Sequence, residues 1–226
     1  MTAHCLALIP VNRFDQAKGR LAEVLAPGER RELARITFRT VLDAVRGAGA
    51  TPVVLTADPE VPGVAGAGTR VLDEVPSARG LNAQLESAID RLGKERAAPG
   101  GARLLILHAD LPLASAEAVR RLLASAGAPP SALAVQSGDG GTNAMLLCPP
   151  GHFPLAYGPD SYAKHALAAE RSGVSFSEVL SAELSLDLDT PDDVRTLLAT
   201  LPGRDSPAGR YLLGRGVEDR LPARPS

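Results

Sequence analysis

Short, strongly apolar segments alternate along this chain with longer segments whose apolar residues repeat at helical spacing. We expect strands over the short segments, which are residues 4–11, 52–57, 69–74, 102–109, 132–137 and 143–150. We expect helices over the longer ones, which are residues 29–46, 81–96, 115–126 and 161–172. This alternation favours an α/β fold, a Rossmann-like and mostly parallel sheet with helices on both faces.

The chain of 226 residues fits one large α/β domain. Towards its end, residues 184–189 (LSLDLD) are predicted to be extended, and Pro191 is expected to start a last helix through Leu201. The segment 203–226 is rich in Arg, Gly and Pro and has little apolar periodicity. We therefore predict a domain over residues 1–202 and a loosely ordered C-terminal tail over residues 203–226.

Charge and apolar content limit the partners of the chain. The formal net charge of -2 has no basic excess in any block, so neither a nucleic acid nor an anionic membrane is indicated, and small molecules are favoured. The apolar segments are too short to span a membrane, and no signal segment follows Met1, so we expect a cytoplasmic protein. Cys5 and Cys148 lie in strand-like segments and are expected to be buried, reduced thiols.

Asp110 follows a continuous apolar segment in LLILHADLPLAS, residues 104–115. A strand that is apolar throughout is buried on both faces, so the first polar group beyond it emerges at the carboxyl edge of the sheet, where ligands bind in such folds. Asp110 is thus a candidate ligand of a metal or a substrate. The alternative is that it only turns the chain before the helix that Ser115 caps.

A second carboxylate ends the segment 184–189. In strict alternation, its leucines share one face, and Asp187 and Asp189 share the other. Asp189 could also belong to the N-cap region of the helix that starts at Pro191. Two aspartates at the ends of two strands could hold one Mg²⁺, which proteins typically bind through one or two carboxylates and substrate phosphates. This pair indicates phosphoryl or nucleotidyl transfer.

The chain has only three lysines, and one of them, Lys18, lies between Arg13 and Arg20 in the segment that follows the first strand. A basic loop at this position in an α/β sheet is a common site for a nucleotide triphosphate. The alternative is a solvated charged turn, since neither a P-loop nor a GxGxxG pattern is present.

Two further loops could approach an anion. SGDGGTNAM, residues 137–145, carries three glycines between two strands, although Asp139-Gly140 is also a strong hairpin signal. YGPDSYAKH, residues 157–165, leads into a helix whose N-terminal Ser161 could bind a phosphate or act as a plain N-cap. Together with the basic loop and the two aspartates, these loops outline a site for two phosphorylated ligands.

Six segments over residues 8–194 form a specific set when taken together: IPVNRFDQAKGRLAEVLAPGERRELAR, RGLNAQL, HADLPL, GGTNAMLL, YGPDSYAKH and LDLDTPDDV. As a set, and in this order, they resemble the guanylyltransferases that activate a small phosphorylated acid in the biosynthesis of the deazaflavin coenzyme F(420). The chain departs from the common family pattern at Asn12, in the GDGGTNA loop and at Lys164.

The resemblance implies a nucleotidyltransferase-like fold that joins GMP from GTP to phosphoenolpyruvate or 2-phospho-L-lactate and releases pyrophosphate. It implies magnesium as the cofactor, held by Asp110 and Asp189, which with Lys18 would form the catalytic set. The phosphorylated acid would be held by Thr142, Gly158 and Ser161, and the nucleotide by Arg13, Lys18, Arg20 and Asn82. The product would pass to a downstream deazaflavin-transferring enzyme, and a homodimer is left open.

The expected chemistry needs no general base, because an acceptor phosphate is already anionic near neutral pH. His165 is accordingly given a packing or hydrogen-bonding role. Phosphoenolpyruvate is the favoured acid, because the Arg-, Ala- and Gly-rich composition suggests a GC-rich bacterial genome, and bacterial proteins resembling this one tend to use it. Two alternatives stay open: a nucleotidyltransferase for another acceptor, such as 3-phosphoglycerate or a sugar phosphate, and a non-catalytic nucleotide-binding regulatory module.

Overall fold

The computed structural model describes residues 5–95 and 103–223. Its centre is a sheet with the strand order β3-β2-β1-β4-β6-β5-β7, in which β6 is antiparallel to its neighbours and the other pairs are parallel. The strands are β1 Cys5–Val11, β2 Thr51–Thr56, β3 Arg70–Asp73, β4 Arg103–Leu107, β5 Ser131–Gln136, β6 Thr142–Cys148 and β7 Ser175–Glu178. The mostly parallel sheet is confirmed; β7, a short and largely exposed edge strand, was not predicted.

The predicted helices are present, with boundaries that shift by a few residues. Residues 4, 96 and 102, at the ends of predicted strands and of one predicted helix, lie outside the described residues. The helices are α1 Pro27–Gly47, α2 Val61–Ala65, α3 Gly80–Glu95, α4 Ala116–Ala124, α5 Ser161–Arg171, α6 Ala182–Ser185, α7 Pro191–Leu198, α8 Leu201–Asp205 and α9 Pro207–Gly214. Ser115 caps α4 as predicted, because its Oγ accepts a hydrogen bond from the Ala118 amide at 3.1 Å. None of the helices within the described residues has the length and apolar character that a membrane span requires.

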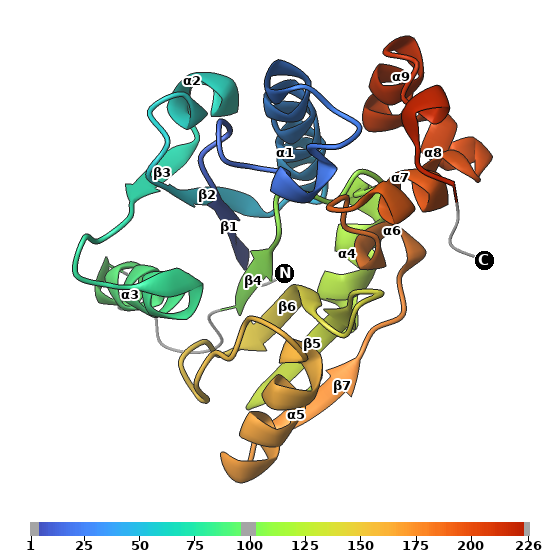
Figure 1. Ribbon diagram of the computed structural model, residues 1–226. Helices are drawn as coiled ribbons and strands as arrows, with labels where there is room; N and C mark the ends of the chain where they lie inside the picture. The colour runs from blue at the N-terminus through green and yellow to red at the C-terminus, as the bar shows by residue number, and fades with distance from the viewer. Residues whose placement is uncertain (1–4, 96–102, 224–226) are drawn as a thin grey trace.

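Helices cover both faces of the sheet, with α1 and α4 on one side and α3 and α5 on the other (Figure 1). Successive residues of β4 alternate between the two cores: Leu105 packs with the α1 side, whereas Leu104 and Ile106 pack with the α3 side. This period of two explains why the segment before Asp110 is apolar throughout. Cys5 and Cys148 are both buried, as expected.

The prediction of a loosely ordered tail is wrong for the described part of residues 203–226. The last helix was expected to run from Pro191 to Leu201, but α7 ends at Leu198, and α8 and α9 follow it. Leu212 and Val217 are fully buried in a third core with Leu33 of α1 and Leu197 of α7. Thr200 and Ser206 cap the two additional helices through their side chains. The helices are too short for their apolar period to be recognised, and burial against α1 and α7 stabilises them.

Candidate active site

The loops that follow β1 and β4 meet at one edge of the sheet because these strands are parallel neighbours. A cleft of about 640 Å³ opens at this edge and includes residues from both loops, from the ends of β2 and β3 and from the start of α3. Its volume lies within the range of ordinary ligand sites. The cleft therefore lies at the carboxyl edge predicted for the ligand.

Lys18 is at the centre of the charges in this cleft. Its Nζ lies 3.2 Å from Asp110 Oδ2 and 3.0 Å from Asp189 Oδ1, and its side chain is only 4% exposed. Lys18 also adopts a left-handed backbone conformation, with φ of 59°; among the described residues, only Asp160 shares this feature outside glycine. Such backbone strain is often retained where it positions a functional group. The lysine and the two aspartates predicted to act together are thus in direct contact.

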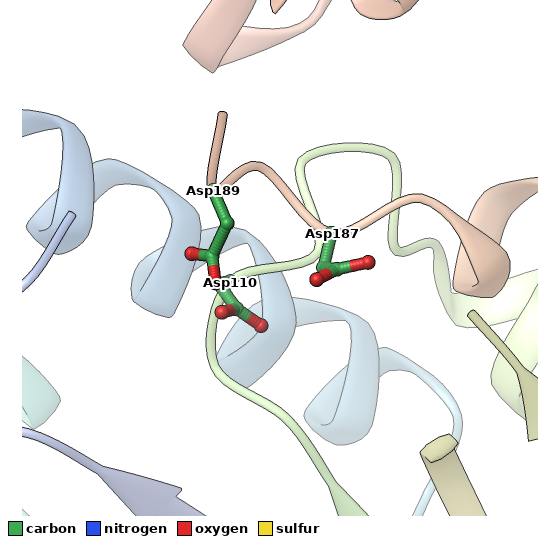
Figure 2. A group of neighbouring side chains, drawn as sticks. All are labelled: Asp110, Asp187 and Asp189. Atoms are coloured by element: carbon green, nitrogen blue, oxygen red, sulfur yellow. The ribbon is translucent and has the colours of Figure 1, made fainter. Parts of the chain in front are cut away.

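A third carboxylate, Asp187, completes the cluster. One oxygen from each of Asp110, Asp187 and Asp189 lies within 4.8 Å of the others, and Figure 2 shows Asp187 and Asp189 approaching Asp110 from one segment of chain. The Leu188 amide donates to the Asp110 carbonyl at 3.2 Å, which holds that segment against the loop after β4. Asn143 Nδ2 lies 3.3 Å from Asp187 Oδ1. The strand alternation had placed Asp187 on the same face as Asp189, but only Asp189 was predicted to be a ligand. The shared face was the sequence signal that could have identified Asp187 as a further ligand.

The segment 184–189 was predicted to be extended throughout, and this is wrong for its first two residues. Leu184 and Ser185 belong to α6, and the chain becomes extended only at Leu186. Thr190, rather than Asp189, is the N-cap of α7, because its side chain accepts from the Asp193 amide. The Asp189 carboxylate can therefore face Lys18 and is not used for capping. Asp110 likewise does more than turn the chain before α4.

The charges within the cluster alter each other's titration. Burial acts to raise the pKa of Asp110, but the Lys18 ammonium and His108 outweigh it and hold that pKa below its usual value. Burial acts to lower the pKa of Lys18, but Asp110 and Asp189 outweigh it and raise that pKa. Burial, followed by the charge of Asp110, raises the pKa of Asp187 to about 6. The Asp187 carboxyl therefore keeps its proton to a higher pH than an ordinary aspartate does.

The donor set fits a divalent cation such as Mg²⁺. Asp110 Oδ1 is buried and accepts no hydrogen bond from the described residues. Such an oxygen is costly to bury unless a ligand satisfies it. Carboxylate oxygens are the hard donors that Mg²⁺ prefers, and several carboxylates can share its charge. Asp110, Asp187 and Asp189 are therefore the residues that would hold it.

The residues predicted to hold the phosphorylated acid are brought together at the start of α5. Ser161 Oγ donates to Thr142 Oγ1 at 3.1 Å, and both side chains are buried. The amide of Ala156 donates to His165 Nε2 at 2.9 Å, which assigns the ring proton to Nδ1, 3.1 Å from Thr142 Oγ1. Burial, with a smaller contribution from His108, lowers the pKa of His165 to about 4. The neutral histidine thus orients Thr142, whose own hydroxyl hydrogen remains able to donate.

Gly158 lies in the loop before α5 with φ of 128°, and a side chain added there would meet no atom within 4 Å. The glycine is required by its backbone conformation, and the space beside it is open. Asp160 occupies the N-cap position of α5, so the alternative of Ser161 as a plain N-cap is wrong. Asn143, next to Thr142 in β6, contacts Asp187, which joins this region to the carboxylate cluster.

Of the four residues predicted to bind the nucleotide, two line the cleft and two do not. Lys18 and Arg20 line the cleft, and Arg20 Nη2 lies 3.4 Å from Asp189 Oδ2. Arg13 does not line it and pairs with the exposed Asp15 at 3.1 Å. Asn82 is also outside the lining; its amide donates to the Tyr157 carbonyl and accepts from the Tyr157 amide. Asn82 therefore holds the loop that carries Gly158.

The fold and the carboxylate cluster define an α/β protein of the nucleotidyltransferase class. A solved structure named as a nucleotide-diphospho-sugar transferase of Desulfovibrio desulfuricans G20 superposes with a TM-score of 0.78 at 18% identity, over 97% of this chain and 99% of that one. A nucleotidyl transferase of Methanothermobacter thermautotrophicus gives a TM-score of 0.58 at 16% identity, over 86% of this chain and 95% of that one.

The chain belongs to the family described as guanylyl transferase CofC like, whose model matches residues 5–220. The phosphoenolpyruvate guanylyltransferase of Rubrobacter xylanophilus is 40% identical, over 86% of this chain and 93% of that protein. The 2-phospho-L-lactate guanylyltransferase of Methanothermobacter thermautotrophicus is 34% identical, over 91% of this chain and 88% of that protein. By family the protein is a guanylyltransferase, as the resemblance of its motifs implied.

Proposed function

We propose that the protein transfers GMP from GTP to phosphoenolpyruvate, with release of pyrophosphate, in coenzyme F(420) biosynthesis, and that the reaction depends on Mg²⁺. The observation that carries the proposal is the contact of Lys18 with Asp110 and Asp189, beside Asp187, in a nucleotide-sized cleft. Relatives named phosphoenolpyruvate guanylyltransferase are 40%, 36%, 36%, 34% and 32% identical, against 34%, 33% and 32% for relatives named for 2-phospho-L-lactate, so the three highest of these identities belong to the first group. This order supports phosphoenolpyruvate as the acceptor.

In the proposed reaction, a phosphate oxygen of the acid attacks the α-phosphorus of GTP. A new P–O bond forms, the bond to the β-phosphate oxygen breaks, and pyrophosphate leaves with the bonding electrons. The attacking oxygen is already anionic, so no side chain has to remove a proton. What the protein supplies is positioning and neutralisation of charge.

Each part of the site has a role in this reaction. Lys18 and Arg20 face the triphosphate, and Thr142, Ser161 and the open backbone at Gly158 hold the acid. Mg²⁺, bound by the three carboxylates, would neutralise phosphate charge. The released product would be consumed by an enzyme that transfers a deazaflavin. That the protein forms a homodimer and that it is cytoplasmic stay predictions.

Pyrophosphate release tests the proposal, measured with each of the four NTPs against phosphoenolpyruvate, 2-phospho-L-lactate, 3-phosphoglycerate and a sugar phosphate. GTP with phosphoenolpyruvate should be the best pair, and EDTA should abolish its turnover. Asp110→Asn and Asp189→Asn should also abolish it without loss of fold, whereas Asp43→Asn, at a side chain 77% exposed on α1, should be neutral. Preference for a sugar phosphate would favour the alternative acceptor class, and no release with any pair would favour a regulatory module.

A further inference from the structure

Glu74 is a carboxylate in the cleft that the proposed reaction does not use. It directly follows β3 and lines the same cleft as Lys18 and Asp110. Its amide donates to the Thr56 carbonyl at 3.2 Å, which fixes its backbone at the sheet edge. Its side chain is half-buried and has no hydrogen bond or ion pair with any residue in the described ranges. A carboxylate left without a partner inside a cleft is suited to a ligand that carries hydrogen-bond donors.

The chain beside Glu74 is held rigidly by Gln84 of α3. Gln84 Oε1 accepts from the Val75 amide at 2.8 Å, and its Nε2 donates to the carbonyls of Val75 at 2.8 Å and Ala78 at 2.6 Å. Gln84 is only 8% exposed, so these bonds are shielded from water. The loop after β3 is thereby attached to a helix at three points. A side chain recognises a ligand selectively when neighbouring hydrogen bonds hold its backbone in one position.

The order of the strands places Glu74 at a useful distance from the phosphate-binding charges. In the sheet, β3 is separated from β4 by three strand spacings, so the ends of the two strands, which Glu74 and the loop of Asp110 follow, lie about 14 Å apart across the sheet edge. Lys18 enters from the loop after β1, which lies between them. This span is comparable to an extended purine nucleotide. A nucleotide whose α-phosphate lies at the carboxylate cluster therefore has its base near Glu74.

We propose that Glu74 selects guanine, accepting hydrogen bonds from its N1–H and its 2-amino group, and that Gln84 is the positioning residue for this contact. Among the four common bases, only guanine presents two adjacent donors that match a carboxylate. Adenine and cytosine present an acceptor at the equivalent ring nitrogen, and uracil has carbonyl oxygens on both sides of its single donor. Leu55, Ala78 and Leu81 line the cleft with Glu74 and offer apolar contact to the base. This inference rests on the proposed use of GTP.

Nucleotide preference tests the assignment. The value of kcat/KM would be measured with GTP, with ITP, which lacks the 2-amino group, and with XTP, which carries a 2-oxo group. Glu74→Ala should lower the value for GTP by about 10- to 150-fold, the loss expected for hydrogen bonds to a charged group, and bring the GTP:ITP ratio close to one. Glu74→Gln should shift preference from GTP towards XTP, because its amide N–H can donate to the 2-oxo group.

The control is Glu86→Gln, at an exposed glutamate on α3 outside the cleft lining, which should keep the wild-type preference. Gln84→Glu keeps the acceptor for Val75 but loses both donated bonds, so its GTP:ITP ratio should fall between those of the wild type and Glu74→Ala. The KM for the acid should not change in any of these variants. An unchanged GTP:ITP ratio in Glu74→Ala and Glu74→Gln would overturn the assignment.

Failure of the proposed function is distinguishable from failure of this inference. If the wild type released no pyrophosphate, the proposed reaction would fail, and calorimetric affinities for GTP and ITP would still test Glu74. Tighter binding of GTP than ITP that is lost in Glu74→Ala supports the guanine contact in either case. A ratio of GTP affinity to ITP affinity that is the same in the wild type and in Glu74→Ala refutes it.

Discussion

Replacing Lys18 by Met tests the charge balance of the site most directly. Methionine keeps the length and apolar stem of the side chain but removes the ammonium that lies 3.2 Å from Asp110 and 3.0 Å from Asp189. The variant leaves three neighbouring carboxylates without this counter-charge. Removing one partner of a buried ion pair costs about 3–5 kcal/mol of folding free energy.

That cost has to be reduced for solvent screening, because the side chains of Asp110 and Asp189 are 27% and 31% exposed. We expect a loss of about 2–3 kcal/mol in metal-free buffer. For a domain of this size, about 1 kcal/mol corresponds to a shift of roughly 2–4 °C in Tm, so the expected decrease is roughly 4–12 °C. Added Mg²⁺ can supply the missing positive charge and should restore much of this stability.

The assay is thermal unfolding in EDTA and across a titration of Mg²⁺, for the wild type, Lys18→Met and Lys94→Met. Lys94 is exposed on α3 outside the cleft lining, so its replacement should leave both curves unchanged. Lys18→Met should gain more Tm from Mg²⁺ than the wild type does, while its turnover stays low. Equal Tm of Lys18→Met and the wild type in EDTA would refute the charge argument. An equal response to Mg²⁺ would refute the assignment of the carboxylates as its ligands.

Ser161→Ala should raise the KM for the acid about 10- to 150-fold and leave the KM for GTP unchanged, because it removes a hydroxyl beside Thr142. Steady-state kinetics with both substrates measures this, and a raised KM for GTP with an unchanged KM for the acid would show that the two pockets are assigned the wrong way round. The pKa of Asp187 is about 6 in the folded protein and 3.8 for an ordinary aspartate. The unfolded chain therefore loses this proton first, and the free energy of unfolding of the metal-free protein decreases as the pH rises from about 4 through 6. Asp187→Asn should therefore be more stable than the wild type at pH 7.5 in EDTA but not near pH 4, as denaturant unfolding can show. Leu212→Ala should cost about 2–5 kcal/mol of folding free energy, because Leu212 is fully buried; a loosely ordered tail would give no change in the same measurement.

Local periodicity was sufficient for most of the fold. The alternation of apolar segments predicted the strands of the parallel sheet, and Ser115 marked the start of α4. These features depend on neighbours a few residues apart, so they can be read from a single sequence. The edge strand β7 and the helices α8 and α9 were missed because they are short and polar or weakly periodic. Residues of α9 are ordered by the burial of Leu212 against α1 and α7, and not by the helix-forming tendency of α9 itself.

The sequence by itself determined that Asp110 would emerge at the carboxyl edge of a buried strand and that Lys18 would follow the first strand. Only the tertiary structure decided that Lys18 contacts Asp110 across 92 positions and Asp189 across 171. It also decided that Asp187 joins them, through the backbone bond from Leu188 to Asp110. Composition and spacing describe which groups a segment carries, but strand order determines which loops share an edge. A charge cluster made from three loops is therefore a property of the topology, since no local pattern specifies which distant carboxylates one lysine will neutralise.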